Sequence, residues 1–199
     1  MDVSLSRSSL VDSTDAVLAD QAAHHPAQQP NEAFAELYRR HVDRVYRYLL
    51  ARTGSVQDAQ DITSQTFLSA LEGIHHYRGE ASFAGWVLGI ARRKLADHYR
   101  SPDKSGNMLS LDEAEYVAQI APLPDDIVSN QLQLERILAA LGVIAPERAE
   151  ALSLHIFGEL TVKEIGQVMG KNDAAARMLI HRALNDLRTR LVHEEKTNG

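Results

Sequence analysis

The chain of 199 residues contains no cysteine, so disulfides and thiolate metal sites are excluded. Apolar residues make up 44% of the sequence, but no continuous apolar run is long enough to span a membrane. The first residues also lack a basic stretch followed by an apolar one, which is the pattern of a secretory leader. We therefore expect a cytoplasmic protein with no membrane insertion of its own.

Positive charge is scarce overall, because the formal net charge is −6. Its distribution is uneven: acidic residues gather in residues 1–30 and 103–126, whereas residues 92–100 and the last helical segment are net basic. Binding to nucleic acid depends on a local basic stripe and not on the global charge. The composition therefore leaves a nucleic-acid-binding function open.

Motifs of enzymes and metal sites are also missing. There is no phosphate-cradling glycine loop and no His-Glu-x-x-His sequence. Ser101 and Lys104 have the Ser-x-x-Lys spacing, but they open a linker and not a helix. His75 and His76 are adjacent, and neighbouring loop residues need further ligands to hold one ion. We expect no enzymatic activity, no cofactor and no metal site.

What is present is helical periodicity, which predicts an all-α protein of two small domains joined by a flexible acidic linker. Residues 1–30 lack a sustained period and are predicted to be a disordered tail. The first domain is expected at 31–101, the linker at 102–126, the second domain at 127–192 and a short tail at 193–199. A linker of this length predicts that the domains move independently until a partner clamps them.

The first domain is predicted to contain three helices. Gly54 ends the first of them, Ser55 caps the second and Ser82 caps the third. Ser101-Pro102 ends the third, because a residue before proline avoids the helical region. The predicted inward-facing residues include several apolar side chains from each helix: Phe34, Leu37, Tyr38, Val45, Tyr48, Leu49, Ile62, Phe67, Leu71, Phe83, Trp86, Val87, Ile90 and Leu95.

Residues 160–191 have the pattern of a helix-turn-helix DNA reader. Thr161 and Glu164 can form a capping box, Gly170 suits a left-handed helix end, and Asn172 or Asp173 can cap the next helix. Pro146 can open the preceding helix as its first residue. Ala176, Ile180, Ala183, Leu184, Leu187 and Leu191 form the predicted core stripe of the last helix. An ordinary helical hairpin with a solvated basic face is the alternative.

If the last helix enters the major groove, its early residues face base edges. We predict that Arg177 is the main base contact and that Lys171, Arg182, Arg188 and Arg190 suit phosphates. The complete predicted reader set is Lys171, Asp173, Ala174, Arg177, Met178, His181 and Arg182.

Two blocks of the sequence resemble one family. Residues 58–100 contain an Asp-x-x-Asp helix start, a Tyr-Arg-Gly-Glu-Ala-Ser-Phe-x-x-Trp stretch and Ile-Ala-Arg, and the C-terminal hairpin contains His-Arg-Ala-Leu. In this order and spacing, they resemble regions two and four of bacterial sigma factors of the extracytoplasmic-function (ECF) group. The resemblance implies binding to core RNA polymerase through its beta-prime and beta subunits, promoter recognition, and assistance in opening the DNA.

By resemblance, the last helix reads the minus-thirty-five element and the first domain meets the minus-ten element. Asp58, Asp61 and Gln65 are expected to bind polymerase, although the two carboxylates could instead only stabilise their helix N-terminus. The expected minus-ten contacts are His76, Tyr77, Arg78, Arg92, Arg93, Lys94, His98 and Arg100. Tyr77 could stack on an extruded base or pack on the core, whereas Phe83 and Trp86 are expected in the core. An anti-sigma factor is a further expected partner.

The chain departs from the family pattern at three places. Ser64-Gln65 replaces a Gln-Glu pair, Arg93 stands where asparagine is common, and Leu179 replaces a cation in the reading helix. Leu179 is expected to turn toward the core or a partner. The promoter sequence that the chain reads therefore cannot be inferred from that of typical relatives. A self-sufficient helix-turn-helix repressor or activator remains the alternative function.

Overall fold

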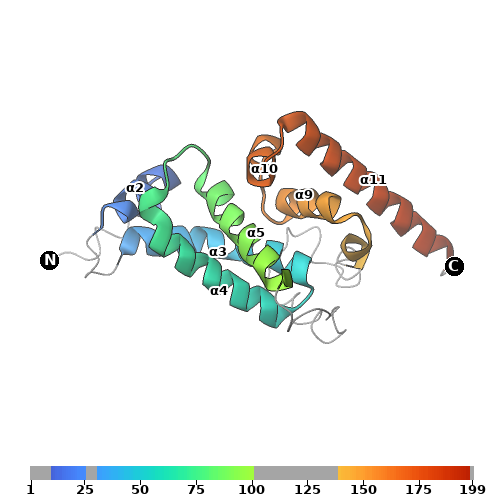
Figure 1. Cartoon of the computed structure of the whole chain (residues 1–199), viewed down its shortest axis with the longest axis horizontal. Helices are drawn as coiled ribbons and strands as arrows, with labels where there is room; N and C mark the ends of the chain where they lie inside the picture. Colours follow the sequence, from blue (N-terminus) through green and yellow to red (C-terminus); the bar gives the residue numbers. More distant parts are fainter. Residues whose placement is uncertain (1–9, 26–30, 101–138, 198–199) are drawn as a thin grey trace.

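The computed structural model describes residues 10–25, 31–100 and 139–197, with side chains through Arg190. Within these ranges the structure is helical and contains no strand, which confirms the all-α prediction. The predicted linker at 102–126 lies outside the described residues. Two bundles are present, and Figure 1 shows them side by side.

The N-terminal bundle consists of α2 (Asp15–Ala23), α3 (Glu32–Thr53), α4 (Val56–Gly73), the short 3-10 helix η1 (Ile74–His76) and α5 (Phe83–Arg100). Three of its predicted helix ends are confirmed, whereas Ser101 and Pro102 lie outside the described residues. Gly54 is left-handed at φ 67°, and the Ser55 hydroxyl accepts a hydrogen bond from the Asp58 amide at 3.2 Å. The Ser82 hydroxyl accepts one from the Gly85 amide at 3.1 Å, which caps α5.

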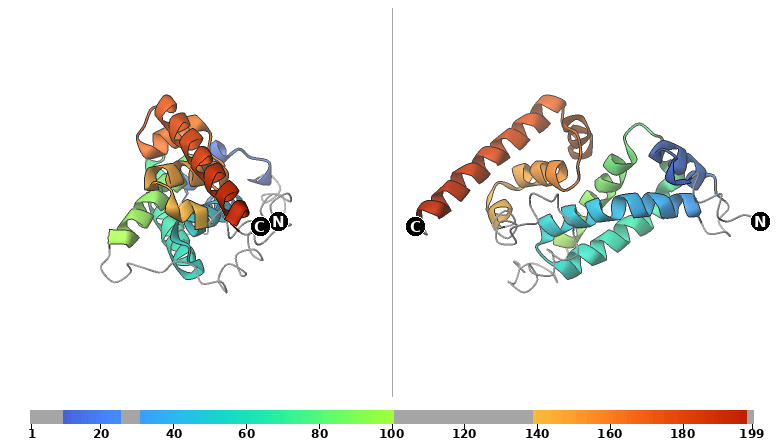
Figure 2. Two further views of the ribbon diagram at one scale, coloured as in Figure 1. Left: turned by 90° about the vertical axis from the view of Figure 1, so that its right-hand side faces the viewer. Right: turned by 180° about the vertical axis from the view of Figure 1, so that it is seen from behind.

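The C-terminal bundle consists of α9 (Pro146–Ile156), α10 (Val162–Met169) and α11 (Asp173–Thr197), and residues 139–143 are also helical. Pro146 is in the first turn of α9, as predicted. In Figures 1 and 2, α11 is a long arm that leaves the rest of the molecule toward the C-terminus, while α9 and α10 lie between α11 and the N-terminal bundle.

The predicted core stripes are mostly correct. Tyr48, Phe83 and Val87 are fully buried in the N-terminal bundle, and Ala176 and Ala183 are fully buried in the C-terminal bundle. Leu71, Tyr38 and Leu184 are corrections, since their exposed fractions are 42%, 43% and 45%. Leu71 and Leu184 lie at the edge of their apolar stripes. Tyr38 contacts Phe67 of α4 at a ring-centroid distance of 4.8 Å, but the rest of its ring is open. Trp86 is only partly buried but packs against the core.

The disordered tail predicted over residues 1–30 is wrong for residues 15–23, which form α2. Thr14 caps this helix, and its residues Leu18, Ala19 and Ala22 are buried against the N-terminal bundle. The chain entering α2 is anchored by Arg40 of α3, whose guanidinium donates to the carbonyls of Leu10, Val11 and Ser13. Tertiary burial therefore orders a segment that lacks a strong helical period of its own.

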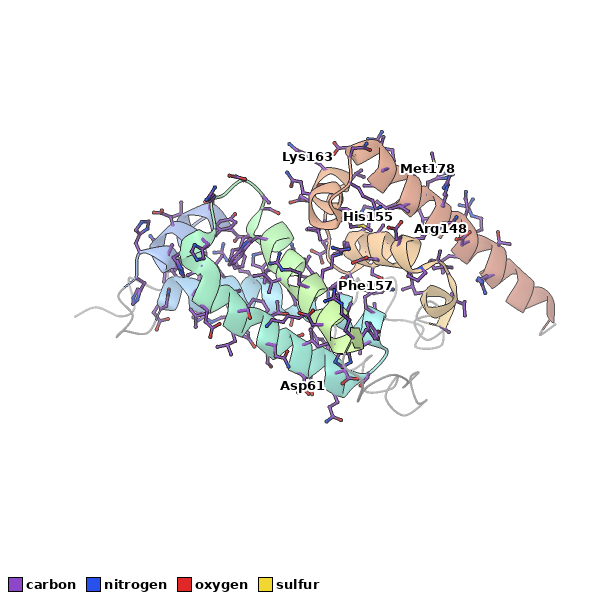
Figure 3. The ribbon with its side chains drawn as sticks, viewed as in Figure 1. Asp61, Arg148, His155, Phe157, Lys163 and Met178 are labelled. Carbon is purple, nitrogen blue, oxygen red and sulfur yellow. The ribbon has the colours of Figure 1, made fainter. Side chains whose placement is uncertain are left out.

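The two bundles are in contact, which differs from the expectation of independently moving domains. Helix α10 packs beside α5, and α9 packs beside α3. Buried apolar residues of both bundles belong to one continuous core cluster. In Figure 3 the side chain of Phe157 lies at the end of α9 nearest the N-terminal bundle.

Candidate nucleic-acid interface

The turn of the helix-turn-helix is determined by local hydrogen bonds. The Thr161 amide donates to the Glu164 carboxylate at 2.8 Å, and the Glu164 amide donates to the Thr161 hydroxyl at 3.3 Å, which completes the predicted capping box. Gly170 is left-handed at φ 65°, and the Asn172 side chain accepts from the Ala175 amide at 2.8 Å. A Cβ at Gly166 would lie 2.7 Å from the Lys171 carbonyl oxygen, so the two helices approach closely because of this glycine.

Helix α9 holds α11 in place from the side opposite its outer face. Arg148 pairs with Asp186 of α11 at 2.8 Å, and Glu147 pairs with Lys171 at 3.1 Å. Ala176, Ile180, Ala183 and Leu187 supply the buried stripe of α11. The first turns of α11 are thereby presented on a supported helix, and Figure 3 shows Met178 on its outer side.

Most of the predicted reader set lies on this outer surface. Asp173, Ala174, Arg177, Met178, His181 and Arg182 are exposed. Lys171 is half-buried, and its ammonium already has Glu147 as a partner. Leu179 is partly buried against the core, as its departure from the family pattern suggested. Within the described part of the chain, Arg177 and Arg182 form no ion pair, so both guanidinium groups are available to a ligand.

The cations of α5 do not form one continuous stripe, because consecutive helical residues point in different directions. Arg92 faces the C-terminal bundle and donates to Glu150 at 2.6 Å. His98 lies 3.6 Å from the Asp58 carboxylate on α4, and Arg100 pairs with Asp97 at 3.1 Å. Arg93 is exposed and Lys94 is half-buried. The structure therefore brings only part of the predicted minus-ten set to a common surface.

The loop before α5 contains Tyr77, whose ring is packed on the core. The ring centroid lies 5.3 Å from that of Trp86 and 5.9 Å from that of Phe83, and the hydroxyl donates to the Ala81 carbonyl at 2.7 Å. Burial raises the pKa of Tyr77. Of the two alternatives for Tyr77, stacking on an extruded base and packing on the core, the structure shows core packing. His75 and His76 of η1 are exposed, and so are Arg78 and Glu80 of the loop that follows.

The outer face of α4 exposes Asp61, Ser64, Gln65 and Leu68. Figure 3 shows Asp61 at the lower edge of the molecule, on the side opposite α10 and α11. Asp58 is more covered, with 23% of its side chain exposed beside His98. Asp61 and Gln65 are thus open to a partner, whereas Asp58 lies at the rim of this face.

Sequence reasoning missed the contacts that join the two bundles. Glu159 accepts from Arg44 at 2.8 Å and from Arg47 at 3.0 Å. Glu164 of the capping box also accepts a hydrogen bond from the Ser82 hydroxyl. Burial raises the pKa of Glu164, but hydrogen bonds from Ser82 and Thr161 and the charge of Arg44 outweigh it, so the net shift is downward. These partners are far apart in sequence, and no local pattern predicts them.

The described residues contain neither a candidate metal cluster nor a candidate membrane span. No three His, Asp or Glu side chains there are grouped so that they could hold a metal ion. Among the same residues, no helix is both long and apolar enough to cross a membrane. The arrangement is that of a helical protein with a helix-turn-helix hairpin in one bundle and an exposed face of α4, which contains Asp61, in the other.

Comparison with known proteins identifies this class. Residues 37–105 match Sigma-70 region 2, and residues 134–187 match Sigma-70, region 4. The chain belongs to the sigma-70 family of RNA polymerase sigma factors, in the extracytoplasmic-function group.

Two relatives define how far this similarity extends. The chain is 36% identical over 163 residues to the ECF RNA polymerase sigma factor BldN of Streptomyces coelicolor, covering 78% of this chain but only 59% of BldN. It is 30% identical over 159 residues to the RNA polymerase sigma factor CarQ of Myxococcus xanthus, covering 79% of this chain and 88% of CarQ. The alignment thus spans less than two thirds of BldN and most of CarQ.

Two solved structures have the same fold. CnrH, solved in complex with the cytosolic domain of CnrY, superposes with a TM-score of 0.68 over 90% of this chain and 97% of CnrH, at 22% identity. The sigma factor RpoE of Bartonella quintana, solved with the anti-sigma factor NepR, gives 0.63 over 80% of this chain and 97% of RpoE, at 15% identity.

Proposed function

We propose that the chain is an alternative sigma factor that binds core RNA polymerase, directs it to specific promoters and assists promoter opening. In this proposal α11 reads the minus-thirty-five element in the major groove, and α5 with its preceding loop meets the minus-ten element. The presence of both sigma regions in one chain, in the family order, supports it.

The observation that carries the proposal is the separation of two exposed faces. Asp61 and Gln65 are exposed on α4, where Figure 3 shows Asp61 at the lower edge of the molecule, and Arg177 is exposed on α11. A protein with both faces free can hold polymerase and DNA at the same time. Acidic side chains on the first face suit a basic partner surface and set the register of docking.

The remaining assignments follow from this role. We place the polymerase- and minus-ten-binding domain at 31–101 and the minus-thirty-five-binding domain at 127–192. Arg78, Arg93, Lys94 and His76 are proposed to contact the minus-ten region, and Arg92, His98 and Arg100 to join them after exchanging their protein partners. Core polymerase and promoter DNA are the proposed partners, together with an anti-sigma factor on family grounds. The proposed location is the cytoplasm, and no catalytic role is assigned.

The test of the proposal is holoenzyme assembly with Asp61→Arg. A reversed charge on the docking face should weaken binding to core polymerase at least ten-fold, which corresponds to about 1.4 kcal/mol. Asp43→Arg is the matched control, because it makes the same change on the exposed surface of α3. Size-exclusion chromatography measures assembly, and run-off transcription measures promoter opening. Equal assembly by both variants would remove α4 from the polymerase contact.

The alternative of a self-sufficient helix-turn-helix repressor or activator is not favoured. It requires only the C-terminal hairpin, whereas the family match also covers residues 37–105 of the N-terminal bundle. Tight binding of operator DNA by a dimer that does not bind core polymerase would support this alternative instead.

A further inference from the structure

Helix α2 lies close to the loop that precedes α5. It packs beside α3, η1 and α5, and Figures 1 and 2 show it on the side of the molecule where the loop of residues 77–82 leads into α5. Its apolar face, made of Leu18, Ala19 and Ala22, is buried. The match to Sigma-70 region 2 covers residues 37–105, so α2 lies outside it. The matched region therefore assigns α2 no role, although the helix borders a segment proposed to meet DNA.

Asp15, in the first turn of α2, connects this helix to α3 through two interactions. One of its carboxylate oxygens accepts from Arg40 at 3.0 Å, and the other lies 2.6 Å from Nε2 of His41. The same guanidinium donates to three backbone carbonyls of the segment that leads into α2. The Asp15 side chain is 34% exposed and that of His41 is 5% exposed, so the pair reaches from the surface into the interior. The position of α2 and the orientation of the His41 ring are therefore coupled.

The buried ring of His41 is oriented by this one hydrogen bond. Its Nδ1 has no hydrogen-bond partner within the described residues, so the contact between Nε2 and Asp15 selects the tautomer and the ring plane. The ring packs on Phe83, the first residue of α5, at a centroid distance of 5.1 Å. Removal of the carboxylate would leave a buried imidazole unpaired, which favours a turn of the ring or entry of water. Either change acts directly on Phe83.

Phe83 belongs to an aromatic cluster that holds the loop of residues 77–82. The Phe83 ring lies 5.9 Å from that of Tyr77 and 5.6 Å from that of Trp86, measured between ring centroids. Tyr77 is the first residue of the loop, and its hydroxyl donates to the Ala81 carbonyl near the other end at 2.7 Å. The shape of the loop therefore depends on where the Phe83 ring lies.

Asp15 also acts on the loop through its charge. Burial is the main cause of the raised pKa of Tyr77, and the Asp15 carboxylate is the second cause. A charge has such an effect only where it lies near the ring, because the interaction falls with distance. Helix α2 thus reaches the loop by two routes, one through His41 and Phe83 and one directly.

We propose that α2 is a positioning element for promoter opening, in which Asp15 orients His41 and the contact of His41 with Phe83 sets the shape of the loop that meets the minus-ten element. The inference rests on the proposed sigma-factor function, because the role of the loop belongs to that proposal. It extends the minus-ten site to residues that do not touch DNA. Arg78, which is exposed in the loop, is the contacting side chain that this support aims at the promoter. Displacement of such a group by about 1 Å is enough to impair a step that depends on geometry.

Trp86 allows the loop anchor to be observed without DNA, because it is the only tryptophan of the chain. Its ring lies 5.3 Å from that of Tyr77 and is partly buried against the core. Asp15→Ala should shift the Trp86 emission to longer wavelength and increase its quenching by acrylamide. Asp20→Ala is the matched control, since it removes the same charge from α2 at a side chain that is 76% exposed. The control should leave both signals as in the wild type.

Promoter selectivity is a readout that a general loss of folding does not change. A promoter that the wild type transcribes is compared with a derivative that has one substitution in the minus-ten element, and run-off transcription gives the ratio of the two products. Asp15→Ala should reduce this ratio about three-fold or more. Assembly with core polymerase, measured by size-exclusion chromatography, should stay unchanged. A smaller folded fraction would lower both products equally and leave the ratio as it is.

Two further variants test the route through His41. Asp15→Asn keeps an oxygen that can accept from Nε2 of His41 but loses the ion pair with Arg40, so it should keep most of the selectivity that Asp15→Ala loses. In a His41→Gln background, Asp15→Ala should reduce the selectivity little further, because the ring that it orients is already absent.

The proposal fails if Asp15→Ala and Asp20→Ala have the same selectivity or the same Trp86 emission. It also fails if Asp15→Asn loses as much selectivity as Asp15→Ala, or if the losses from Asp15→Ala and His41→Gln add in full. A wild type that neither assembles with core polymerase nor transcribes any promoter would instead contradict the sigma-factor proposal, and this inference with it. An active wild type with unchanged selectivity in Asp15→Ala would contradict this inference alone.

Discussion

Helices α5 and α11 are both proposed to meet promoter DNA, but their surroundings differ. Helix α5 is packed by α3, α4 and α10, and Phe83, Val87, Leu88, Ala91 and Leu95 are all buried. Helix α11 is packed by α9 and α10 along one stripe, and its outer side is open. Helix α5 is therefore buried within a core, whereas α11 packs on a core along one side only.

The cations of the two helices differ in the same way. Arg92, His98 and Arg100 of α5 all lie beside carboxylates of the protein. Arg177 and Arg182 of α11 form no ion pair with any residue that the structure describes. Binding DNA through α11 therefore requires no prior rearrangement of these side chains, while binding through α5 requires exchange of partners. The difference suggests that α11 is the first contact with the promoter and α5 a later one.

The largest expected effect tests the difference in packing. Leu88 of α5 is fully buried and Leu184 of α11 is 45% exposed. Leu88→Ala should lower the free energy of unfolding by about 2–5 kcal/mol because it leaves a cavity between α5 and the C-terminal bundle. Leu184→Ala should change it by less than about 0.5 kcal/mol. Urea denaturation followed by circular dichroism measures both. A large loss in Leu184→Ala would show that the outer side of α11 is covered in solution.

The next effect tests whether α11 reads sequence. Arg177→Ala should cost about 1–3 kcal/mol in discrimination between upstream elements if the guanidinium makes a bidentate base contact. Arg188→Ala is the matched control, since Arg188 is exposed on the same helix and is expected to contact phosphate only. Run-off transcription from promoters with varied upstream elements gives the preference. A preference that Arg177→Ala leaves unchanged would remove this residue from the reader set.

A smaller effect separates two neighbouring cations of α5. Arg93 is exposed, so Arg93→Ala should reduce the slope of log affinity against log salt by about one unit, because one phosphate contact is lost. Arg92→Ala should reduce it less, since Arg92 only exchanges Glu150 for a phosphate. Fluorescence anisotropy with a DNA duplex between 50 and 200 mM salt, the range over which such contacts are screened, measures both slopes. Equal slopes for the two variants would mean that Arg92 is not paired with Glu150 before the protein binds DNA.

Local sequence signals predicted the helix ends well. The structure has the predicted helix caps at Ser55, Thr161, Gly170 and Asn172. These caps are predictable because each depends on residues within one turn of each other. The exposed positions of the reader set also followed from helical periodicity. Their roles toward DNA and polymerase stay predictions, since exposure alone assigns no ligand.

Signals that depend on distant residues were missed. Helix α2 has a recognisable cap in Thr14, but its apolar face is weak, and its order depends on Arg40 of α3. The pair of Arg92 and Glu150 joins residues that are 58 positions apart. Leu71 and Leu184 share the spacing of buried neighbours yet lie beyond the reach of the packing helix. Periodicity identifies the apolar side of a helix but not how much of it a partner covers.

The smallest expected effect concerns protonation beneath α5. His41 of α3 is 4% exposed, contacts Phe83 at a centroid distance of 5.1 Å and lies 2.6 Å from the Asp15 carboxylate through Nε2. Burial lowers the pKa of His41 and outweighs the Asp15 charge, which acts to raise it. The neutral ring therefore donates its Nε2 proton to Asp15, while Nδ1 has no hydrogen-bond partner within the described residues.

A lowered pKa means that the unfolded chain takes up a proton more readily than the folded one. The stability contributed by neutral His41 is complete above pH 6.5, the ordinary value for histidine, and is lost as the pH falls below it through the folded value. Unfolding at pH 7.5 and 5.5 should show a loss of stability in the wild type that His41→Gln reduces. The loss should loosen the docking of α2 and the packing of α5, and leave α11 on α9 intact. Amide hydrogen exchange distinguishes these helices, and equal loss of protection in α5 and α11 would mean that acid acts on the fold as a whole.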